Sequence, residues 1–305
     1  MKFNASTVDA VCQQVVGRRD QIEVVVAALA ADRHVLLEGP PGTGKSTLLR
    51  SLAASAEVPF VFVEGNAELT PARLAGQFDP ARVLTDGYSP DVFIDGPLTE
   101  AVREGALLYV EELNRVPEET LNLLITAMSE REVHVPRLGR IPAAEGFRLV
   151  AAMNPFDAVG TARISAAVYD RMCRVAMGYQ TSEEETAVAA RESGAAAGAL
   201  TGKVVELVRH TRDHPEIRIG SSVRGAIDTL LIAEQLSAIR ESGSGQTLLD
   251  AALAALSGRI RVHEGTGRTA EEIITELFLL VFDDRDESDG DGEGKGSTPD
   301  GATAG

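Results

Sequence analysis

The sequence predicts an α/β domain with a parallel sheet, followed by a smaller all-helical domain and a disordered acidic tail. Up to residue 180, short apolar runs rich in β-formers alternate with helix-like segments, which is the pattern of βαβ units. Residues 181–282 carry only the periodicity of helices. From residue 283 the composition changes to Asp, Glu, Gly and Ser without apolar periodicity. We therefore expect domains at 1–180 and 181–282 and a tail at 283–305.

Length, charge and cysteine content narrow the class of protein. A chain of 305 residues is long enough for about two domains. The formal net charge of −17 argues against a large phosphate-binding surface for DNA or RNA, and so against a nucleic-acid partner. Cys12 and Cys173 lie far apart without a C-x-x-C motif, which favours a reducing cytosol over a disulfide or zinc site. No signal-type segment and no run of about 18 apolar residues occurs, so we expect a cytoplasmic protein without a membrane partner.

A glycine-rich stretch lies between the apolar run 35–37 and the helix-like run 47–52. Its sequence, G-P-P-G-T-G-K-S, fits the P-loop pattern G-x-x-x-x-G-K-[ST] in the strand-then-helix context that this motif requires. The glycines let backbone N–H groups turn toward phosphate oxygens, and the helix N-terminus adds a partial positive charge. Lys45 can reach the β and γ phosphates, and Ser46 would hold Mg²⁺. The predicted nucleotide-binding residues of this stretch are Gly39, Pro40, Pro41, Gly42, Thr43, Gly44, Lys45, Ser46 and Thr47.

Further strands and helices follow the P-loop and are interrupted by an insertion. Residues 69–105 contain many turn formers, and a long insertion inside a compact domain is more often functional than idle. Pro117 opens a helix, and residues 131–142 suggest a hairpin. Around these segments the sequence predicts a helix at 21–31 and strands at 35–37, 59–63, 106–110, 147–153 and 175–178.

Two adjacent carboxylates follow the third predicted strand. The run 106–110 is fully apolar, as in a strand buried on both faces, and Glu111 and Glu112 come directly after it. Ligands of open α/β sheets bind at the carboxyl ends of the strands. Phosphoryl transfer needs a carboxylate near Mg²⁺ and, for hydrolysis, a group that orients or deprotonates water. We therefore assign the metal contact to Glu111 and the catalytic base to Glu112.

The second domain opens on a helix signal. Ser182 and Glu185 have the spacing of a capping box, so a helix is expected to start there. The Gly- and Ala-rich residues 193–202 and the Ser-Gly residues 242–245 predict mobile connections between helices. The acidic tail has two open interpretations, a solubilising end or an electrostatic partner contact.

Taken together, the motifs resemble those of the AAA+ ATPases and, within that class, of the MoxR family. The resemblance spans residues 16–225, and the run Glu-Leu-Asn-Arg-Val-Pro at 112–117 is specific to this family and its chelatase-like neighbours. In one departure, most relatives have Asp where this chain has Glu111, which bears on the geometry of the metal contact and on the hydrolysis rate. The matching stretches are residues 16–18, 39–46, 93–98, 111–117, 151–155, 169–172 and 221–225.

The resemblance implies roles for residues outside the P-loop. Asn154 matches sensor 1, which would position the attacking water. Arg171 matches the arginine finger that reaches a neighbouring subunit's site, with Met172 where the family usually has Phe. Arg174 is a second candidate for the finger. Arg224 matches sensor 2, which would report the γ-phosphate to the helical lid domain.

The resemblance also implies cofactors and partners. Val16 and Gly17 match the place where adenine packs, so ATP is preferred over GTP, with Mg²⁺. A finger acting on a neighbour implies a homo-oligomeric ring, most often a hexamer. The insertion at 69–105 and the hairpin near 133–141 match elements that face the ring's pore or a partner surface. The implied function is an ATP-hydrolysing, chaperone-like motor that remodels or activates a client protein, by maturation or cofactor insertion, together with a von Willebrand factor A domain protein.

Other functions remain open at this point. The ATPase subunit of a metal chelatase, or of a gas-vesicle or Rubisco-activating complex, shares the same core. A non-hydrolysing, nucleotide-dependent interaction module is a different class, to which Glu111 lends modest support. A nucleic-acid motor is a third class, against which the net charge argues.

Overall fold

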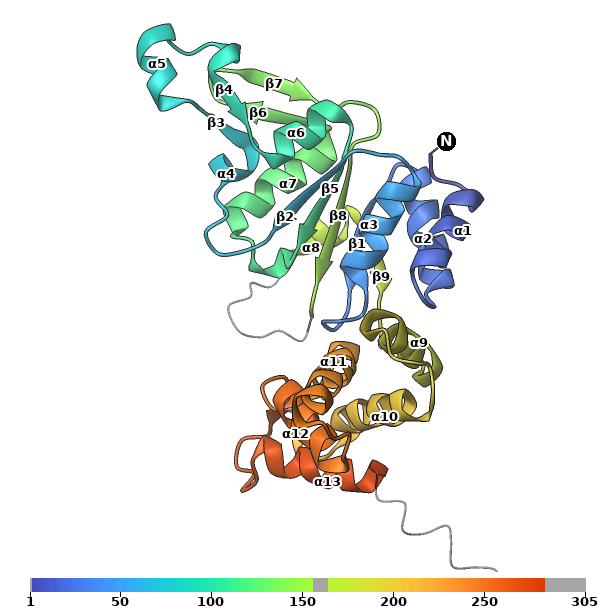
Figure 1. Cartoon of the computed structure of the whole chain (residues 1–305). Coiled ribbons are helices and arrows are strands. Elements are labelled where there is room, and N and C mark those ends of the chain that lie inside the picture. Colours follow the sequence, from blue (N-terminus) through green and yellow to red (C-terminus); the bar gives the residue numbers. More distant parts are fainter. Residues whose placement is uncertain (1, 156–163, 283–305) are drawn as a thin grey trace, which may run out of the picture. The chain divides into compact units, whose positions relative to one another are not determined.

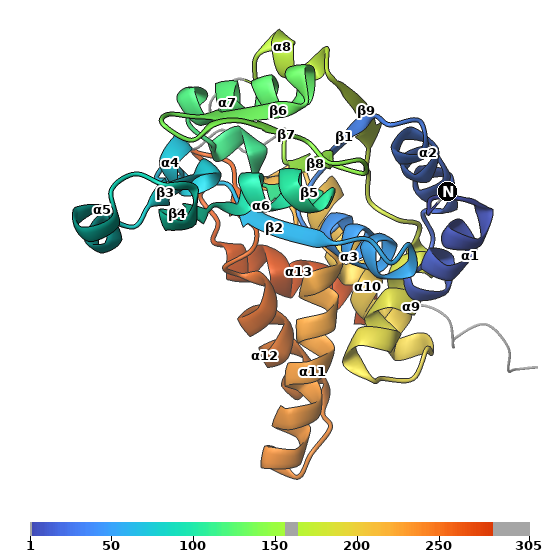
Figure 2. The ribbon, with the colours of Figure 1, turned by 90° about the horizontal axis from the view of Figure 1, so that it is seen from above.

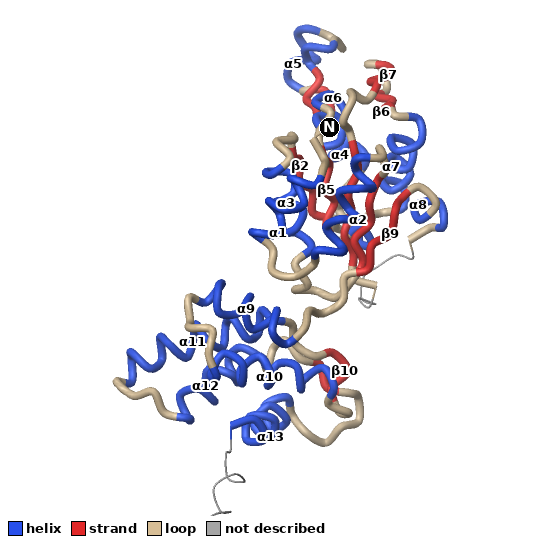
Figure 3. The backbone as a smooth tube through the Cα atoms, turned by 90° about the vertical axis from the view of Figure 1, so that its right-hand side faces the viewer, coloured by secondary structure: helices blue, strands red, loops and turns tan. Residues whose placement is uncertain are grey.

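The computed structural model describes residues 2–155 and 164–282, which form two compact units. The first unit extends to Val188 and the second begins at Ala189, so the division falls inside helix α9 (Ser182–Ser193). A parallel sheet with helices forms the first unit, and the second is mainly helical (Figure 3). The expected acidic tail at 283–305 lies outside the described residues.

A five-stranded parallel sheet forms the centre of the first unit (Figure 1). Its strand order is β2-β5-β8-β1-β9, so the strand before the P-loop lies at an inner position. Because all five strands run in one direction, their carboxyl ends meet at one edge of the sheet. This arrangement confirms the parallel α/β fold expected from the sequence. The strands are β1 (His34–Glu38), β2 (Phe60–Glu64), β5 (Leu107–Glu111), β8 (Arg148–Met153) and β9 (Met172–Ala176).

Helices cover both faces of this sheet (Figure 2). Side chains alternate along a strand, so Val35 and Leu37 pack with α1, α2 and α3, while Leu36 packs on the opposite face with α6 and α7. Burial on both faces explains why the inner strands read as continuous apolar runs. The remaining elements of the first unit are α1 (Ala5–Gln14), α2 (Arg19–Ala30), α3 (Lys45–Ser55), α4 (Pro71–Ala75), β3 (Gly76–Phe78), α5 (Pro80–Asp86), η1 (Pro90–Val92), β4 (Phe93–Asp95), α6 (Pro97–Glu104), η2 (Leu113–Arg115), α7 (Glu118–Glu130), β6 (Glu132–Val135), β7 (Gly139–Pro142) and α8 (Ala166–Tyr169).

The insertion at 69–105 folds into a small antiparallel pair, β3 and β4, with α5 at the outer end of their connection (Figure 1). The ring of Phe78 contacts the rings of Tyr88 and Phe93 at centroid distances of 5.0 and 5.2 Å. The hairpin expected from the sequence forms as β6 and β7. At its turn, the guanidinium of Arg137 stacks on Tyr88, 3.8 Å from the ring centroid. The insertion and the hairpin are therefore in direct contact.

The fifth strand starts earlier than predicted. The sequence indicated residues 175–178, whereas β9 begins at Met172 and pairs with β1 along its whole length. Cys173 and Arg174 are exposed on this edge strand, so the apolar pattern did not mark them as strand residues. Backbone pairing with an existing inner strand, rather than side-chain burial, sets this boundary.

The capping box of α9 also differs from the prediction, by one residue. The Glu184 amide donates to Thr181 Oγ1 at 3.2 Å, and the Thr181 amide donates to Glu184 Oε2 at 3.0 Å. The prediction that Ser182 and Glu185 form this box is wrong. Glu185 is buried instead. The reciprocal bonds require the residue before the first helical turn, and that residue is Thr181.

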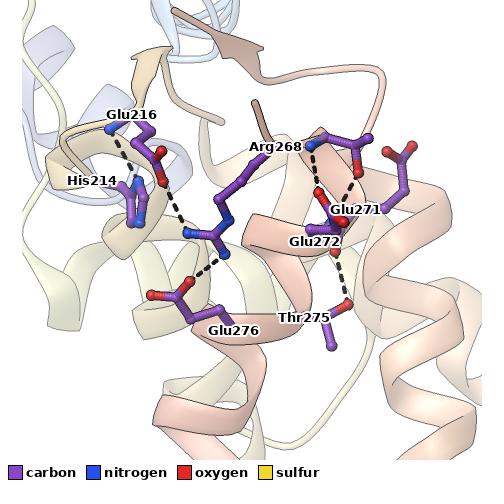
Figure 4. Close-up of polar contacts among 8 residues, drawn as sticks. His214, Glu216, Arg268, Glu271, Glu272, Thr275 and Glu276 are labelled. Atoms are coloured by element: carbon purple, nitrogen blue, oxygen red, sulfur yellow. Dashed lines mark hydrogen bonds and ion pairs between the residues drawn. The ribbon is translucent and has the colours of Figure 1, made fainter. Parts of the chain in front are cut away.

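The second unit is a helical cluster with one short strand pair. The pair β10–β11 was not expected from the helical pattern. Arg268 anchors it, because one guanidinium nitrogen donates to Glu216 Oε2 at 2.9 Å and another donates to Glu276 (Figure 4). The start of β10 is thus tied to the last helix. The elements are α10 (Ala199–Asp213), β10 (Ile217–Ile219), α11 (Val223–Arg240), α12 (Gly245–Leu256), β11 (Arg261–Val262) and α13 (Ala270–Phe282). Neither 2–155 nor 164–282 contains a helix long and apolar enough to cross a bilayer.

Candidate functional site

The P-loop connects β1 to α3 at the carboxyl edge of the sheet. The Gly39 amide donates to Met153 O at 3.1 Å, which holds the start of the loop against β8. Gly44 directly precedes α3 with φ of 82°, a conformation that side chains with a Cβ rarely adopt. Lys45 Nζ donates to the carbonyls of Gly39 and Pro40 at 2.9 and 2.7 Å. The ammonium therefore lies inside the loop, where phosphate oxygens would take over its bonds.

The two side chains predicted to hold the metal are in direct contact. Ser46 Oγ donates to Glu111 Oε1 at 2.6 Å, although the residues come from α3 and β5. The hydroxyl of Tyr109 lies 3.2 Å from Ser46 Oγ. Burial raises the pKa of the Tyr109 phenol, so the phenol stays protonated at neutral pH.

Strand alternation explains why Glu111 faces α3. Leu107 and Tyr109 pack on the α3 side of the sheet, whereas Leu108 and Val110 pack on the other side. Glu111 comes two residues after Tyr109 and shares its face. A hydroxyl and a carboxylate are hard oxygen donors, the kind that Mg²⁺ prefers, so this pair fits the metal that P-loop proteins use.

Glu112 lies at a sharp turn after β5. Its backbone is left-handed, with φ of 52°, and its Oε2 forms an ion pair with Arg115 Nη1 at 3.1 Å. Gly65, just beyond β2, donates its amide to Glu111 O at 2.7 Å. A Cβ at Gly65 would approach Glu112 O to 2.5 Å. The close approach of two strand ends therefore fixes the backbone of the acidic pair.

Asn154 follows β8 at the same edge of the sheet. Its carbonyl accepts a hydrogen bond from Asn114 Nδ2 at 3.2 Å, and Asn114 is nearly buried. Because β8 pairs directly with β5, the two strand ends bring Asn154 and Glu112 to neighbouring positions.

The turn at Val16–Arg18 packs against the segment that follows β9. Val16 O accepts a hydrogen bond from Gln180, and Arg18 Nη2 donates to Gly178 O at 2.6 Å. Burial lowers the pKa of Arg18, and the nearby carboxylate of Glu184 opposes this shift. That carboxylate lies against Gly17, because a Cβ there would be 2.4 Å from Glu184 Oε1.

The same segment reaches the P-loop. The Met177 amide donates to Glu38 O at 2.7 Å, and a Cβ on Gly39 would lie 2.0 Å from Met177 O. The Val16–Gly17 turn is therefore connected to the start of the P-loop through residues 177–180.

The two candidate finger arginines have different surroundings. Arg171 donates to Ser129 Oγ on α7 and to Ala167 O, 2.9 Å away, and its side chain is about one-third exposed. Arg174 instead forms an ion pair with Glu38, whose side chain is only 8% exposed. This carboxylate raises the pKa of Arg174. Arg174 is thus engaged within its own chain, beside the P-loop.

Arg224 belongs to the second unit, near the start of α11. The turn before it is fixed, because Ser221 donates its amide to Thr211 Oγ1 at 2.9 Å and accepts from Arg212 Nε at 2.7 Å. The Arg224 side chain is exposed and forms no hydrogen bond or ion pair with any residue in the described part of the chain.

The first unit therefore brings together the P-loop, Glu111, Glu112 and Asn154, with the Val16–Gly17 turn connected to the loop. It does not bring Arg171 to this group, because that side chain is bonded to α7 and α8. Thr47 is exposed in the first turn of α3.

Sequence reasoning missed three residues of this site, which are Tyr109, Arg115 and Glu38. A signal existed for each. Tyr109 is a hydroxyl in an otherwise aliphatic strand, two residues before Glu111. Arg115 lies three residues after Glu112, within reach of it. Glu38 is a charged residue at the end of a buried strand, and a buried charge is normally paired with an opposite one.

Comparison with known families identifies the domain around this site. Residues 34–172 match the family described as AAA domain (dynein-related subfamily). The parallel sheet, the P-loop and this match together define a AAA+ ATPase domain, which is a nucleotide-binding domain.

Relatives place the chain more narrowly. NorQ of Paracoccus denitrificans is 33% identical over 57% of this chain and 63% of its own length. The gas vesicle ATPase GvpN2 of Halobacterium salinarum is 28% identical over 76% of this chain and 70% of its own length. YeaC of Bacillus subtilis is 27% identical over 90% of this chain and 92% of its own length. The resemblance to the MoxR-type AAA+ ATPases is thereby confirmed.

Solved structures support the fold. A protein from Cytophaga hutchinsonii, assigned as an ATPase, is similar with a TM-score of 0.52 and 22% identity, covering 89% of this chain and 92% of that one. The RuvB Holliday junction branch migration motor of Thermotoga maritima is similar with a TM-score of 0.51 and 17% identity, covering 79% of this chain and 70% of that one. At these identities the likeness concerns the fold alone.

Proposed function

We propose that this protein hydrolyses ATP with Mg²⁺ in a ring of identical subunits and uses the energy to remodel or activate a partner protein. The observation that carries the proposal is the contact between Ser46 and Glu111 at the opening of the P-loop, with Glu112 beside it. This arrangement offers a metal-binding pair and a separate carboxylate, the two acidic functions that hydrolysis of a nucleoside triphosphate needs.

Each residue of the first unit has a role in this proposal. The P-loop amides and Lys45 bind the phosphates, and Ser46 and Glu111 hold Mg²⁺, which neutralises charge on the phosphates. Glu112 and Asn154 orient the attacking water. Val16 and Gly17 hold the adenine.

The ring is proposed from the two arginines that are not bonded to the P-loop. The partly exposed guanidinium of Arg171 would act on the neighbouring subunit's nucleotide, and Arg224 would sense the γ-phosphate from the helical unit. AAA+ ATPases generally act as rings, and a hexamer is the expected number. The contact of Arg137 with Tyr88 joins the insertion to the hairpin, and we propose this joined surface for the client or for a von Willebrand factor A domain partner.

The test is steady-state ATP hydrolysis over a series of protein concentrations, with the mass determined by light scattering in ATP. Wild type should show turnover that rises cooperatively with concentration. Glu112→Gln and Arg171→Ala should each lose turnover while still binding ATP. Wild type that binds ATP, stays monomeric and turns over no nucleotide would overturn the motor proposal.

Mixing the two inactive variants tests whether the site is shared. In a mixed ring, some Arg171→Ala subunits receive an intact finger from a Glu112→Gln neighbour, so part of the activity should return. The matched control is a mixture of Glu112→Gln with a Lys45→Ala, Arg171→Ala double variant. The sites of the double variant lack the phosphate-binding lysine, so a finger from a neighbour should restore no activity there. Activity that fails to return in the first mixture would show that Arg171 does not act in trans.

Two rivals have specific support. The likeness to GvpN2 favours a gas-vesicle or chelatase-like ATPase subunit, and co-purification of the partner would identify it. The ion pair of Glu112 with Arg115 and the presence of Glu111 favour a nucleotide-dependent binding module that does not hydrolyse ATP. Turnover by the pure protein separates that module from a motor.

A further inference from the structure

The hydroxyl of Tyr109 is buried under the two proposed metal ligands. The side chain has no exposed surface, and its oxygen is 3.2 Å from Ser46 Oγ, which in turn donates to Glu111. We propose that Tyr109 is a positioning residue that sets the Ser46–Glu111 pair for Mg²⁺. The inference rests on the proposed function only in taking these two side chains as the metal ligands.

Proton counting limits the directions of these hydrogen bonds. Ser46 has one hydroxyl proton, which it donates to Glu111. The Tyr109 hydroxyl lies 3.2 Å from Ser46 Oγ and also interacts with the Glu111 carboxylate, so both oxygens are acceptors for its proton. Phenol, serine and carboxylate therefore form one hydrogen-bonded cluster, in which each bond strengthens the others. Because Ser46 donates its proton to Glu111, its oxygen keeps a lone pair for a metal.

The ring of Tyr109 is held rigidly, so its hydroxyl has a fixed position. Phe60 and Phe62 on β2 contact it at centroid distances of 6.0 and 5.6 Å. Arg50 on α3 lies over the Phe62 ring at 5.0 Å. A rigid support has a purpose here, because the long Glu111 side chain has several rotatable bonds. Tyr109 offsets this freedom by fixing the serine to which Glu111 is bonded.

The main test measures how Mg²⁺ changes the affinity for a fluorescent ATP analogue. Wild type and Tyr109→Phe are titrated in EDTA and then over a Mg²⁺ series. Affinity without metal should be the same in both, because the P-loop is untouched. The Mg²⁺ concentration that gives half of the change in affinity for the analogue should rise by about 10- to 100-fold in Tyr109→Phe. A loss of this size is typical when a residue that hydrogen-bonds to a metal ligand is removed.

Tyr88→Phe is the matched control, because it removes a hydroxyl from a distant, half-exposed tyrosine in the insertion. Its Mg²⁺ dependence should equal that of wild type. If Tyr109→Phe also matches wild type, the inference is overturned while the proposed function stands. If the binding of the analogue to wild type does not depend on Mg²⁺, the metal site of the proposed function is overturned, and the role of Tyr109 with it.

A second measurement does not depend on the folding of Tyr109→Phe. The chain has four tyrosines, so wild type labelled with 3-fluorotyrosine gives few ¹⁹F resonances, and Phe variants at the other three positions assign them. Adding Mg²⁺ to the ATP complex should move the Tyr109 resonance and leave that of Tyr88 in place. A Tyr109 resonance that does not respond to Mg²⁺ would show a purely structural role.

Discussion

Glu38, the last residue before the P-loop, forms an ion pair with Arg174 on the neighbouring strand β9. Glu38 also affects Tyr169, whose phenol pKa is raised mainly by burial and further by this carboxylate. Tyr169 and Arg174 flank Arg171 in the sequence. The strand that leads into the P-loop therefore interacts with both ends of the segment that carries the candidate finger.

Arg174→Ala should destabilise the domain, because it leaves the buried Glu38 carboxylate without its cation. Thermal unfolding should show a lower melting temperature for Arg174→Ala than for Arg171→Ala. The double variant Glu38→Gln, Arg174→Ala should recover part of the lost melting temperature, because the uncompensated charge of Glu38 is gone. In the mixing assay, Arg174→Ala should not behave as a finger variant. A normal melting temperature together with rescue in trans would assign the finger to Arg174 instead.

Gly65→Ala should reduce ATP turnover more than ATP binding. The added Cβ would lie 2.5 Å from Glu112 O and 2.8 Å from Glu111 O, so the backbone of the acidic pair must shift. Displacements of this size at a reacting centre cost up to about 100-fold in rate. Gly202→Ala is the control, because a Cβ there meets no atom within 4 Å. Equal kcat for Gly65→Ala and wild type would contradict the expected geometry.

Glu111→Asp, which shortens the side chain by one methylene group, should weaken the site in this chain. The shorter side chain loses the 2.6 Å bond from Ser46, so the Mg²⁺ needed for half-maximal ATP binding should rise by about tenfold. Adding Tyr109→Phe to Glu111→Asp should raise this Mg²⁺ requirement less than adding Tyr109→Phe to wild type does, because both residues act through Ser46. Additive effects of the two substitutions would show that they act independently.

Protein stability should fall as the pH drops from about 6.5 to about 4 because of His34. Its Nδ1 accepts a hydrogen bond from the Leu149 amide at 2.8 Å, and burial lowers its pKa from 6.5 to about 4. The unfolded chain binds a proton in this range and the folded chain does not, so acidification favours unfolding by up to about 3 kcal/mol. Above pH 6.5 this contribution is complete, and below pH 4 no more is lost.

Urea unfolding at several pH values measures this effect. His34→Gln keeps an oxygen acceptor for the Leu149 amide but cannot titrate, so its stability should decline less between pH 6.5 and 4. The difference between the two curves isolates His34 from the carboxylates that also titrate in acid. Parallel curves would show that His34 does not contribute.

The P-loop and the acidic pair were predictable because their chemistry lies in continuous sequence. The phosphate-binding pattern lies within one loop and the first residues of the helix after it. Glu111 lies at the end of a strand whose apolar residues indicate burial on both faces. The sheet itself followed from the alternation of strands and helices, because βαβ connections lead to parallel strands. β9 was harder to place, because it is an edge strand with exposed residues.

What the sequence alone determined is therefore the fold class, the phosphate-binding loop and the position of two carboxylates at a strand end, since backbone geometry fixes the spacing within one element. The tertiary structure decided which distant residues meet. Tyr109 reaches Ser46 across 63 residues, and Arg174 reaches Glu38 across 136. Such contacts depend on strand order, register and the packing of α3 on the sheet, which no local pattern encodes.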